Sequence, residues 1–225
     1  MSDFNQYADK YLETLERPCS LSGETPDFYA EGRLRWCKSR LPQIFPIEKV
    51  LDFGCGIGGS FQHFVDILGC KTVVGVDPSA ESLRHAREQH SALDLQLALP
   101  EEFLPKGDLS FVFCNGVFHH IPPEERPQAL AYVRACLTEG GIFAFWENNP
   151  WNPVVVHSMS LNEFDCDAQT ISPAAAVRML KAAGFRVQFL DFCFFFPHFA
   201  HRLRRLERSL RWLPLGAQYL VVAKK

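Results

Sequence analysis

The sequence lacks several features that would assign the protein to common classes. Its 8 cysteines include no C-x-x-C pair and no regular spacing, which disfavours a disulfide framework and favours reduced thiols. No apolar run approaches the ~18 residues of a membrane-spanning helix. The first residues lack a basic head followed by an apolar stretch, so we expect no export signal. A cytoplasmic protein is the expectation.

The chain also has little net charge. The formal net charge is −3, which gives no overall attraction to nucleic acid, so nucleic acid is not an expected partner. No metal is expected either, because His119 and His120 are adjacent and project differently, and no other His or Cys cluster has ligand spacing. Internal repeats and low-complexity tracts are missing. The 225 residues, 47% of them apolar, can instead bury one substantial core.

What the chain does contain is an alternation of two apolar patterns. Short runs rich in Val, Ile and Phe predict strands at 49–53, 72–77, 94–98, 109–115, 141–147, 185–193 and 217–223. Helical spacing occurs at 58–68, 79–90, 123–137 and 172–183. Strands that alternate with helices in this way predict an α/β, Rossmann-like fold, in which helices cover both faces of a mostly parallel, seven-stranded sheet.

The most informative segment is 50–59, where an apolar run breaks into an acidic residue and a glycine-rich turn. Gly54, Gly56 and Gly58 can adopt backbone angles closed to other residues, and they remove the Cβ atoms that would hold a ligand away from the main chain. Asp52 stands two residues before the first glycine. A carboxylate there predicts a positively charged nucleoside over the turn.

A dinucleotide is the alternative ligand. The pattern Gly54-x-Gly56-x-x-Gly59 satisfies the dinucleotide fingerprint, and Asp77 lies 23 residues beyond Gly54, about where that fingerprint places its ribose-binding acid. Spacing alone leaves both ligands open. A carboxylate at Asp52 would repel a pyrophosphate and attract a sulfonium or amino group, which favours the first ligand.

Four segments together carry a family resemblance: 50–59, the run Gly75-Val76-Asp77-Pro78-Ser79, the run 115–122 that begins Asn-Gly-Val-Phe-His-His, and 137–141. In order and spacing they resemble the class I S-adenosylmethionine-dependent methyltransferases, of the bacterial small-molecule type. The resemblance implies S-adenosylmethionine as cofactor, S-adenosylhomocysteine as product, and a sheet whose last strand is reversed.

The same resemblance implies a role for each matching residue. Asp77 would hold the ribose hydroxyls, Pro78 would lie near adenine, and Asn115 would sit beside the methionine group. Many relatives place an acid after the third strand for the adenine amino group. Here proline stands near that position, so Glu101 or Glu102 would substitute. Asp52, Gly54 and Gly56 would cradle the methionine portion, and Phe53, Cys55 and Gly58 of the same turn are further cofactor-binding candidates.

Catalytic candidates follow the fourth and fifth strands. A neutral imidazole of His119 or His120 can accept a hydroxyl proton, and Glu147 is the second choice for a base. The alternative is that a histidine here only shapes the site. Asn149 and Trp151, in a loop of some 20 irregular residues before the helix at 173, are expected to orient and cover a polar methyl acceptor. Local Asn-Pro turn chemistry is the competing explanation.

The two ends of the chain differ from the middle. Residues 1–46 are expected to form a helical lid in which Tyr7, Tyr11 and Tyr29 contact substrate, ahead of a methyltransferase domain at 47–225; packing on the sheet edge is the alternative.

Near the carboxyl end, Leu203, Leu206, Leu210 and Leu213 recur at helical spacing between the arginines of 202–211. A basic amphipathic helix there could contact an anionic membrane surface or an anionic substrate. The plainer interpretation is that the leucines pack this helix against the protein and the arginines form its solvent-exposed face.

The sequence therefore predicts methyl transfer to a small-molecule acceptor, at a hydroxyl oxygen by preference because a histidine base suits it. Carbon methylation of a quinone-like ring and methylation of a lipid-linked or glycan acceptor are alternatives. An NAD-dependent oxidoreductase, a nucleoside-binding protein without catalysis and a membrane-associated scaffold are rivals of other classes. The sequence does not determine the oligomeric state.

Overall fold

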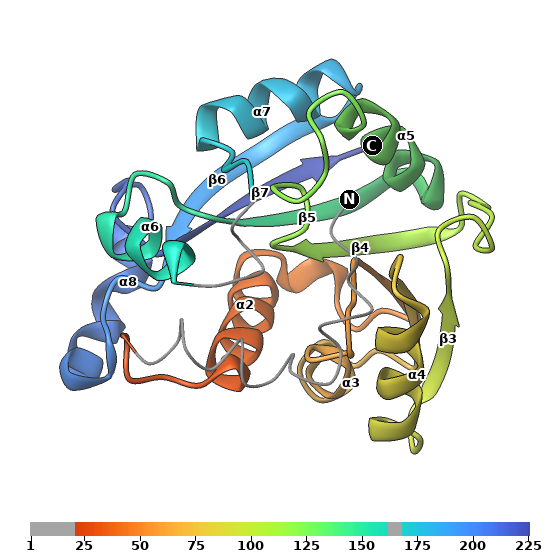
Figure 1. Ribbon diagram of the computed structural model, residues 1–225, viewed down its shortest axis with the longest axis horizontal. Coiled ribbons are helices and arrows are strands. Elements are labelled where there is room, and N and C mark those ends of the chain that lie inside the picture. Colours follow the sequence, from red (N-terminus) through yellow and green to blue (C-terminus); the bar gives the residue numbers. More distant parts are fainter. Residues whose placement is uncertain (1–20, 162–167) are drawn as a thin grey trace.

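The computed structural model describes residues 21–161 and 168–225, which form a seven-stranded sheet in the order β3-β2-β1-β4-β5-β7-β6 (Figure 1). Strands β1 to β5 run parallel, whereas β7 is antiparallel to both β5 and β6. The mostly parallel sheet with a reversed last strand is thus confirmed. The strands are β1 (Lys49–Phe53), β2 (Thr72–Val76), β3 (Asp94–Ala98), β4 (Leu109–Asn115), β5 (Leu137–Asn148), β6 (Arg186–Cys193) and β7 (Gln218–Lys224).

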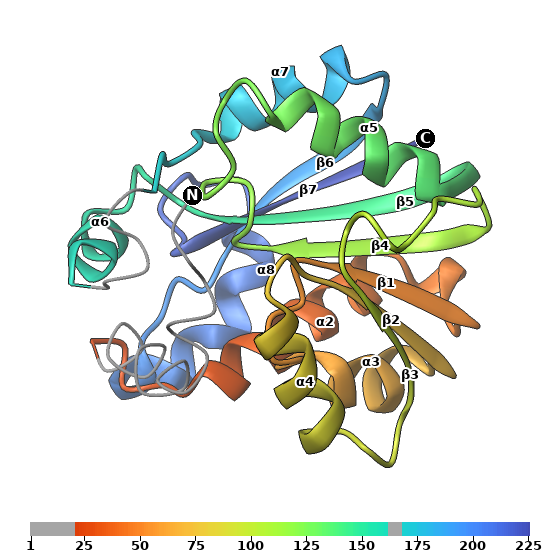
Figure 2. The same ribbon diagram turned by 45° about the vertical axis from the view of Figure 1, so that its right-hand side comes forward.

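Helices cover both faces of this sheet (Figure 2). Helices α5 (Arg126–Cys136) and α7 (Pro173–Ala182) lie on one face. The other face carries α2 (Pro26–Arg40), α3 (Phe61–Leu68) and α4 (Ala80–Gln89). Side chains alternate between the two sides of a strand, so Val50 of β1 joins the core under α2 and α3 while Leu51 joins the core under α5 and α7. Both cores are continuous layers of buried apolar side chains.

Local signals set several helix ends. The Ser172 side chain accepts a hydrogen bond from the N–H of Ala175 at the start of α7, and Ser79 does the same for Ser82 at the start of α4. Helix α3 ends at Gly69, whose φ of 70° lies in the left-handed region. It begins at Phe61, three residues later than the pattern predicts, because the glycine-rich turn occupies 54–60.

The expectation of a long irregular loop after β5 needs correction. Residues Pro153–Ser160 form a helix, α6. The Asn152 side chain caps it by accepting from the N–H groups of Val154 and Val155, and Pro153 fits the first turn because its missing N–H has no partner to lose there. The Asn152-Pro153 pair therefore marks the start of a helix.

The basic segment near the carboxyl end also differs from the expected amphipathic α-helix. It consists of a 3-10 helix, η4 (His198–Leu206), and a single turn, α8 (Glu207–Leu210). The tighter pitch repeats every three residues, so Arg204 and Glu207 face inward while Leu203 and Leu206 are exposed. The leucines therefore do not pack this segment as the plainer interpretation assumed.

Within the described ranges, no helix combines the length and apolar character needed to cross a membrane. Besides the elements above, a short 3-10 turn, η2 (Pro42–Ile44), precedes β1. The expected helix around Tyr7 and Tyr11 lies outside the described residues.

Candidate active site

A cavity of about 1320 Å³ opens at the carboxyl ends of the parallel strands. Its floor is made by the turns after β1, β2 and β4, and its walls by α2, α6 and the segment 194–199. Ligands bind at this edge in open α/β sheets because successive turns there leave a crevice. The volume exceeds that of an ordinary single-ligand pocket, so two small molecules fit side by side.

The glycine-rich turn forms the floor with bare main chain. Gly54 has φ of 76°, and a Cβ at this position would lie 2.3 Å from Cγ2 of Val117. Gly56 has φ of 52° and its N–H points to the neighbouring β2 turn, where it donates to Asp77. No other residue type fits Gly54 without displacing Val117, which itself borders the cavity.

This close approach gives a stability prediction. Gly54→Ala is expected to cost about 3 kcal/mol, from backbone strain and overlap with Val117, and to lower Tm by about 6–12 °C in a chain of this size. Gly59→Ala is the matched control, because nothing lies within 4 Å of a Cβ there and its φ is not positive. Thermal unfolding followed by circular dichroism compares the two; equal Tm values would contradict the assigned packing.

Two buried carboxylates border the turn. Asp52 on β1 is only 4% exposed, and burial raises its pKa to about 8; the positive charge of Arg33 opposes this shift, and Asp77 adds to it. Asp77, after β2, accepts from the N–H of Gly56 at 2.8 Å and of Ser79 at 2.9 Å. Burial also raises the pKa of Asp77, and these two N–H groups offset part of the rise. The backbone thus fixes Asp77 while Asp52 lacks its ordinary solvation.

A third hydrogen-bond acceptor lies close by in the cavity wall. Oδ1 of Asn115, at the end of β4, is buried and has no hydrogen-bond partner in the described part of the chain. Buried polar atoms are nearly always paired in folded proteins, so an unpaired one in a cavity wall indicates a position where a ligand donates. Asp52, Asp77 and Asn115 together suit a ligand that carries positive charge and several donors.

The remaining cofactor candidates divide into two groups. Phe53, Cys55, Pro78 and Glu101 border the cavity as expected. Glu102 does not, because its carboxylate accepts from the N–H of Leu99.

Gly58 also lies outside the cavity lining. Its φ of 82° and a hypothetical Cβ only 2.6 Å from Cδ2 of Phe61 show that it permits the packing at the start of α3. Its neighbour Gly59 borders the cavity instead.

A histidine and a glutamate pair behind the cavity wall. Nδ1 of His119 lies 2.5 Å from Oε2 of Glu147, and the backbone N–H of His119 donates to Oε1 at 3.3 Å. His119 borders the cavity, whereas Glu147 is 1% exposed and does not reach it. His120 also borders the cavity and lies against His119, with ring centroids 4.1 Å apart and ring planes tilted by 49°. Glu147 therefore orients His119, and the notion of Glu147 as a base that meets substrate is wrong.

Asn149 and Trp151 do not border the cavity. The fully buried Asn149 donates through Nδ2 to the carbonyls of Pro214 and Gly216, and its Oδ1 accepts from the N–H of Trp151. Its Nδ2 group thus joins β5 to the loop before β7, and its Oδ1 closes a local turn at Trp151. The structure thus contradicts the expected substrate contacts, and it supports the competing explanation that these polar residues serve local turns.

Helix α2 contributes residues to the opposite wall. Tyr29 borders the cavity, as expected, and packs edge-on against Phe194 at a centroid distance of 5.0 Å. Arg33, which the sequence interpretation missed, is 8% exposed and also borders the cavity. Its NH1 group donates to Oε1 of Gln218 at 3.0 Å, and Gln218 donates in turn to Oδ1 of Asn148 at 3.1 Å. A buried cation in a cavity wall suits an anionic ligand.

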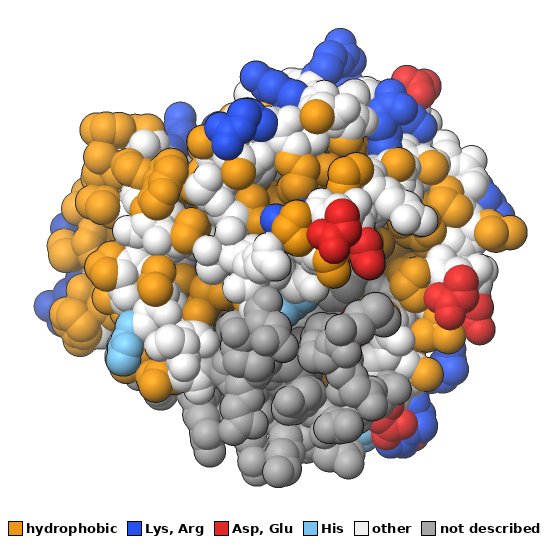
Figure 3. Space-filling view, turned by 45° about the horizontal axis from the view of Figure 1, so that its top comes forward, with side chains coloured by type: hydrophobic (Ala, Val, Ile, Leu, Met, Phe, Trp, Pro, Cys, Tyr) orange, Lys and Arg blue, Asp and Glu red, His pale blue; other side chains and the backbone are white. Residues whose placement is uncertain are grey.

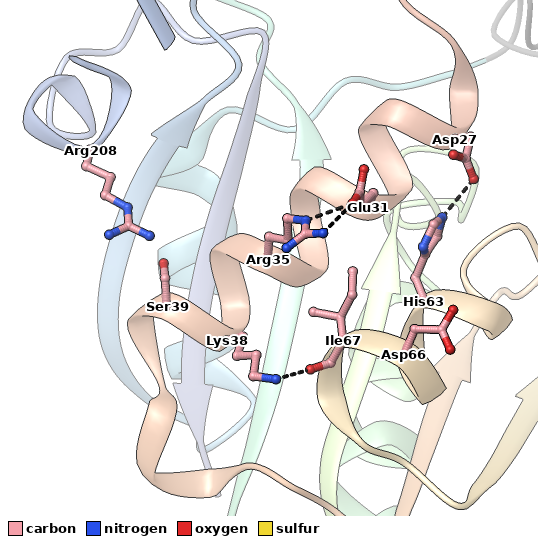
Figure 4. Close-up of a pocket in the computed structure, with 9 residues that line it drawn as sticks. All are labelled: Asp27, Glu31, Arg35, Lys38, Ser39, His63, Asp66, Ile67 and Arg208. Atoms are coloured by element: carbon pink, nitrogen blue, oxygen red, sulfur yellow. Dashed lines mark hydrogen bonds and ion pairs between the residues drawn. The ribbon is translucent and has the colours of Figure 1, made fainter. Parts of the chain in front are cut away.

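A second hollow, of about 680 Å³, lies between α2, α3 and α8 (Figure 4). Several of its polar side chains are engaged within the protein: His63 contacts Asp27 at 2.7 Å, Arg35 contacts Glu31 at 2.7 Å, and Lys38 donates to the carbonyl of Ile67. In the ranges 21–161 and 168–225, no group of three or more His, Cys, Asp or Glu side chains could hold a metal ion. The large cavity is therefore the candidate active site.

Comparisons with known proteins agree with this site. Residues 51–143 match a family model described as a methyltransferase domain. Trans-aconitate 2-methyltransferase from Rhodopseudomonas palustris (strain HaA2) is 33% identical over 118 residues, which are 52% of this chain and 45% of that protein. The match thus spans about half the length of this curated relative.

Solved structures extend the likeness to the whole fold. A possible histamine N-methyltransferase from Thermotoga maritima, described as S-adenosylmethionine-dependent, has a TM-score of 0.65 at 16% identity and covers 99% of this chain and 98% of that chain. Another such methyltransferase, from Archaeoglobus fulgidus, has a TM-score of 0.63 at 19% identity, with 85% and 93% coverage.

The residues present fit S-adenosylmethionine. Asp52 and Asn115 suit its cationic methionine portion and Asp77 its ribose. A dinucleotide fits less well, because the Gly56 N–H that would meet a pyrophosphate already donates to Asp77. Motifs, sheet order, donor set and comparisons converge: this chain carries a class I S-adenosylmethionine-dependent methyltransferase domain.

Proposed function

We propose that the protein transfers a methyl group from S-adenosylmethionine to an oxygen atom of a small molecule that bears a carboxylate, with a hydroxyl group as the preferred methyl acceptor. The observation that carries the proposal is Arg33, a buried guanidinium in the wall of the cavity that also holds Asp52 and Asp77. A guanidinium that borders a cavity can bind a carboxylate in a bidentate way, and this pairing is stronger and more specific than a neutral hydrogen bond. The trans-aconitate relatives act on such an anion, judged by their name.

The choice of a hydroxyl oxygen depends on His119. Bound S-adenosylmethionine supplies an activated methyl group, so the protein has chiefly to align the methyl acceptor, exclude water and remove a proton. Glu147 engages Nδ1 of His119, and we assign uptake of the hydroxyl proton to Nε2, the other ring nitrogen. A carboxylate oxygen, which needs no base, is the second candidate, favoured by the trans-aconitate relatives.

Helix α2 gives the site its cover in this proposal. The side chains of Tyr29 and Arg33 border the cavity, while Leu34 and Cys37 are buried in the core below. One side of α2 is therefore anchored, and the other limits the size of the methyl acceptor. Within the proposed 1–46 lid, α2 is the part that the structure describes.

Arg33→Met tests the proposal. Loss of the cation is expected to raise KM for small hydroxy acids by about 100-fold at saturating S-adenosylmethionine, because a charge-assisted pair in a buried site is worth about 2–5 kcal/mol. S-adenosylhomocysteine release measured over a panel of hydroxy acids and their amide analogues gives the comparison. The amides, which lack the charge, are expected to respond little.

Arg35→Met is the matched control on the same helix, since Arg35 is exposed and pairs with Glu31. It should leave KM unchanged. An equal loss for acids and amides in Arg33→Met would show that Arg33 supports only the fold or the cofactor, and would refute a carboxylate-bearing methyl acceptor.

A further inference from the structure

Large apolar side chains are exposed around the open side of the active-site cavity. We call this surface the rim and define it by Val154, Phe199, Leu203, Leu206, Trp212 and Leu215. Phe199 is 87% exposed, Trp212 70% and Leu215 60%, although folding normally buries side chains of this size. Hydrophobic side chains gather on the left flank in Figure 3, where Figure 1 places α6 and α8.

The rim belongs to one end of the molecule and is continuous with the cavity. Val154 and Phe199, from segments far apart in sequence, both border the cavity. Nδ2 of Asn152, the cap of α6, donates to the carbonyl of Leu215 at 2.8 Å and joins α6 to the loop before β7. The apolar surface therefore reaches the cavity at Val154 and Phe199, and its other members lie on the segments next to these two residues.

Basic side chains accompany the apolar ones on η4. The 3-10 pitch turns Leu203 and Leu206 outward next to Arg202 and Arg205, and neither arginine forms an ion pair with a residue that the structure describes. Glu207 is the only acid in 198–215. It is buried and accepts from the N–H groups of Phe195 and Phe196, so it does not neutralise the outer face.

The inward face of the same segment is firmly held. Arg204 pairs with Glu24 and lies 4.3 Å from the ring centroid of Phe28 on α2. Glu207 and Arg204 thus fix η4 to the body of the protein, while the outer face remains apolar and basic. A rigid surface that combines exposed aromatic and leucine side chains with arginines is the pattern of segments that lie in a lipid interface.

We infer that the rim docks on the surface of an anionic lipid bilayer, with the cavity opening toward that surface. The arginines supply attraction to acidic head groups, and the apolar side chains of the rim insert at the boundary of the acyl chains. This inference goes beyond methyl transfer, and binding to lipid can be measured without a methyl acceptor.

Co-sedimentation with vesicles tests the inference. The native chain is expected to bind vesicles of phosphatidylglycerol and phosphatidylcholine at low salt, to bind pure phosphatidylcholine weakly, and to dissociate as salt increases. Arg202→Gln with Arg205→Gln should weaken binding by about 30-fold, because each basic residue near such a surface contributes a factor of about five. Phe199→Ser with Trp212→Ser should weaken it by about tenfold or more.

Matched controls lie elsewhere on the molecule. Arg87→Gln with Lys106→Gln removes the same charge from exposed positions on α4 and in the β3–β4 connection. Leu104→Ser removes an exposed leucine from that connection. Unchanged binding in these controls, with native far-ultraviolet circular dichroism in all variants, supports the rim as the docking surface.

Three results would overturn the inference. The first is an absence of binding to the anionic vesicles at low salt. The second is equal loss in the rim variants and the controls, which would indicate charge attraction without a defined surface. The third is a concentration-dependent dimer, detected by sedimentation velocity, that Phe199→Ser with Trp212→Ser abolishes while vesicles remain unbound; the rim would then be an interface between two copies of the chain.

Discussion

Replacing His119 by Gln is expected to lower kcat by about 10²–10⁴-fold and to leave the dissociation constant of S-adenosylmethionine nearly unchanged. Glutamine keeps the approximate size and a polar end, but it cannot take up a proton. The large effect follows from the pairing of His119 with Glu147, since the contact of 2.5 Å fixes the ring in the cavity wall. Release of S-adenosylhomocysteine at saturating substrates measures kcat, and calorimetry measures cofactor binding.

Two further variants separate proton transfer from shape. His120→Gln is the control, because His120 borders the cavity without an ion pair to Glu147. Glu147→Gln should reduce kcat less than His119→Gln, and the double variant should be no slower than His119→Gln alone, because Glu147 acts through His119. Full activity of His119→Gln would remove the base and leave a carboxylate oxygen as the methyl acceptor.

Replacing Asp77 by Ala is expected to weaken binding of both S-adenosylmethionine and S-adenosylhomocysteine by about 10²–10³-fold, since two hydrogen bonds to a charged group are lost. The backbone N–H groups of Gly56 and Ser79 already position this carboxylate, so no reorganisation opposes binding in the native protein. Equal losses are expected because the ribose is common to the two molecules. Calorimetric titration of each ligand measures the change.

Asp66→Ala is the control for this variant, as Asp66 is an exposed acid on α3 that accepts only from Gln62. It should bind both ligands as the native protein does. A native dissociation constant in Asp77→Ala would contradict the assignment of Asp77 to the ribose and would place the nucleoside elsewhere in the cavity.

Local sequence patterns were sufficient to predict the floor of the cavity. Gly54 and Gly56 have positive φ, and Asp52 and Asp77 stand at or next to strand ends. The residues of the floor are therefore recognisable from their immediate neighbours in the sequence. The seven strands are separately recognisable from local patterns, whereas the reversed last strand was implied by the family resemblance.

The walls of the cavity depend on contacts between distant residues. Arg33 reaches the site from α2 and contacts Gln218, 185 residues away. No pattern in the sequence around Arg33 predicts this contact. The pairing of His119 with Glu147 was within reach: Asn115 and Trp146 are paired in the β4–β5 register, so the residues that follow the two strands meet at one edge. Asn149 was misjudged because the carbonyls that it binds belong to the loop before β7.

The helical pitch near the carboxyl end could not be predicted from leucine spacing. Intervals of three and four residues suit an α-helix, but residues 198–206 form a 3-10 helix, and the buried Glu207 that follows it accepts from the N–H groups of Phe195 and Phe196. The exposed rim is the consequence, and it is visible only in the folded chain.

The central claim is that acidic and amide side chains at the edge of the sheet bind a cationic adenosine. Titration calorimetry with S-adenosylmethionine at pH 7, in two buffers of different ionisation enthalpy, tests it most directly. Burial raises the pKa of Asp52 to about 8, so the free protein holds this carboxyl mostly protonated at pH 7. A cation favours the ionised form, so we predict one site per chain and a net release of protons on binding, which Asp52→Asn reduces. Failure to bind S-adenosylmethionine, or tight binding of NAD in its place, would contradict the account.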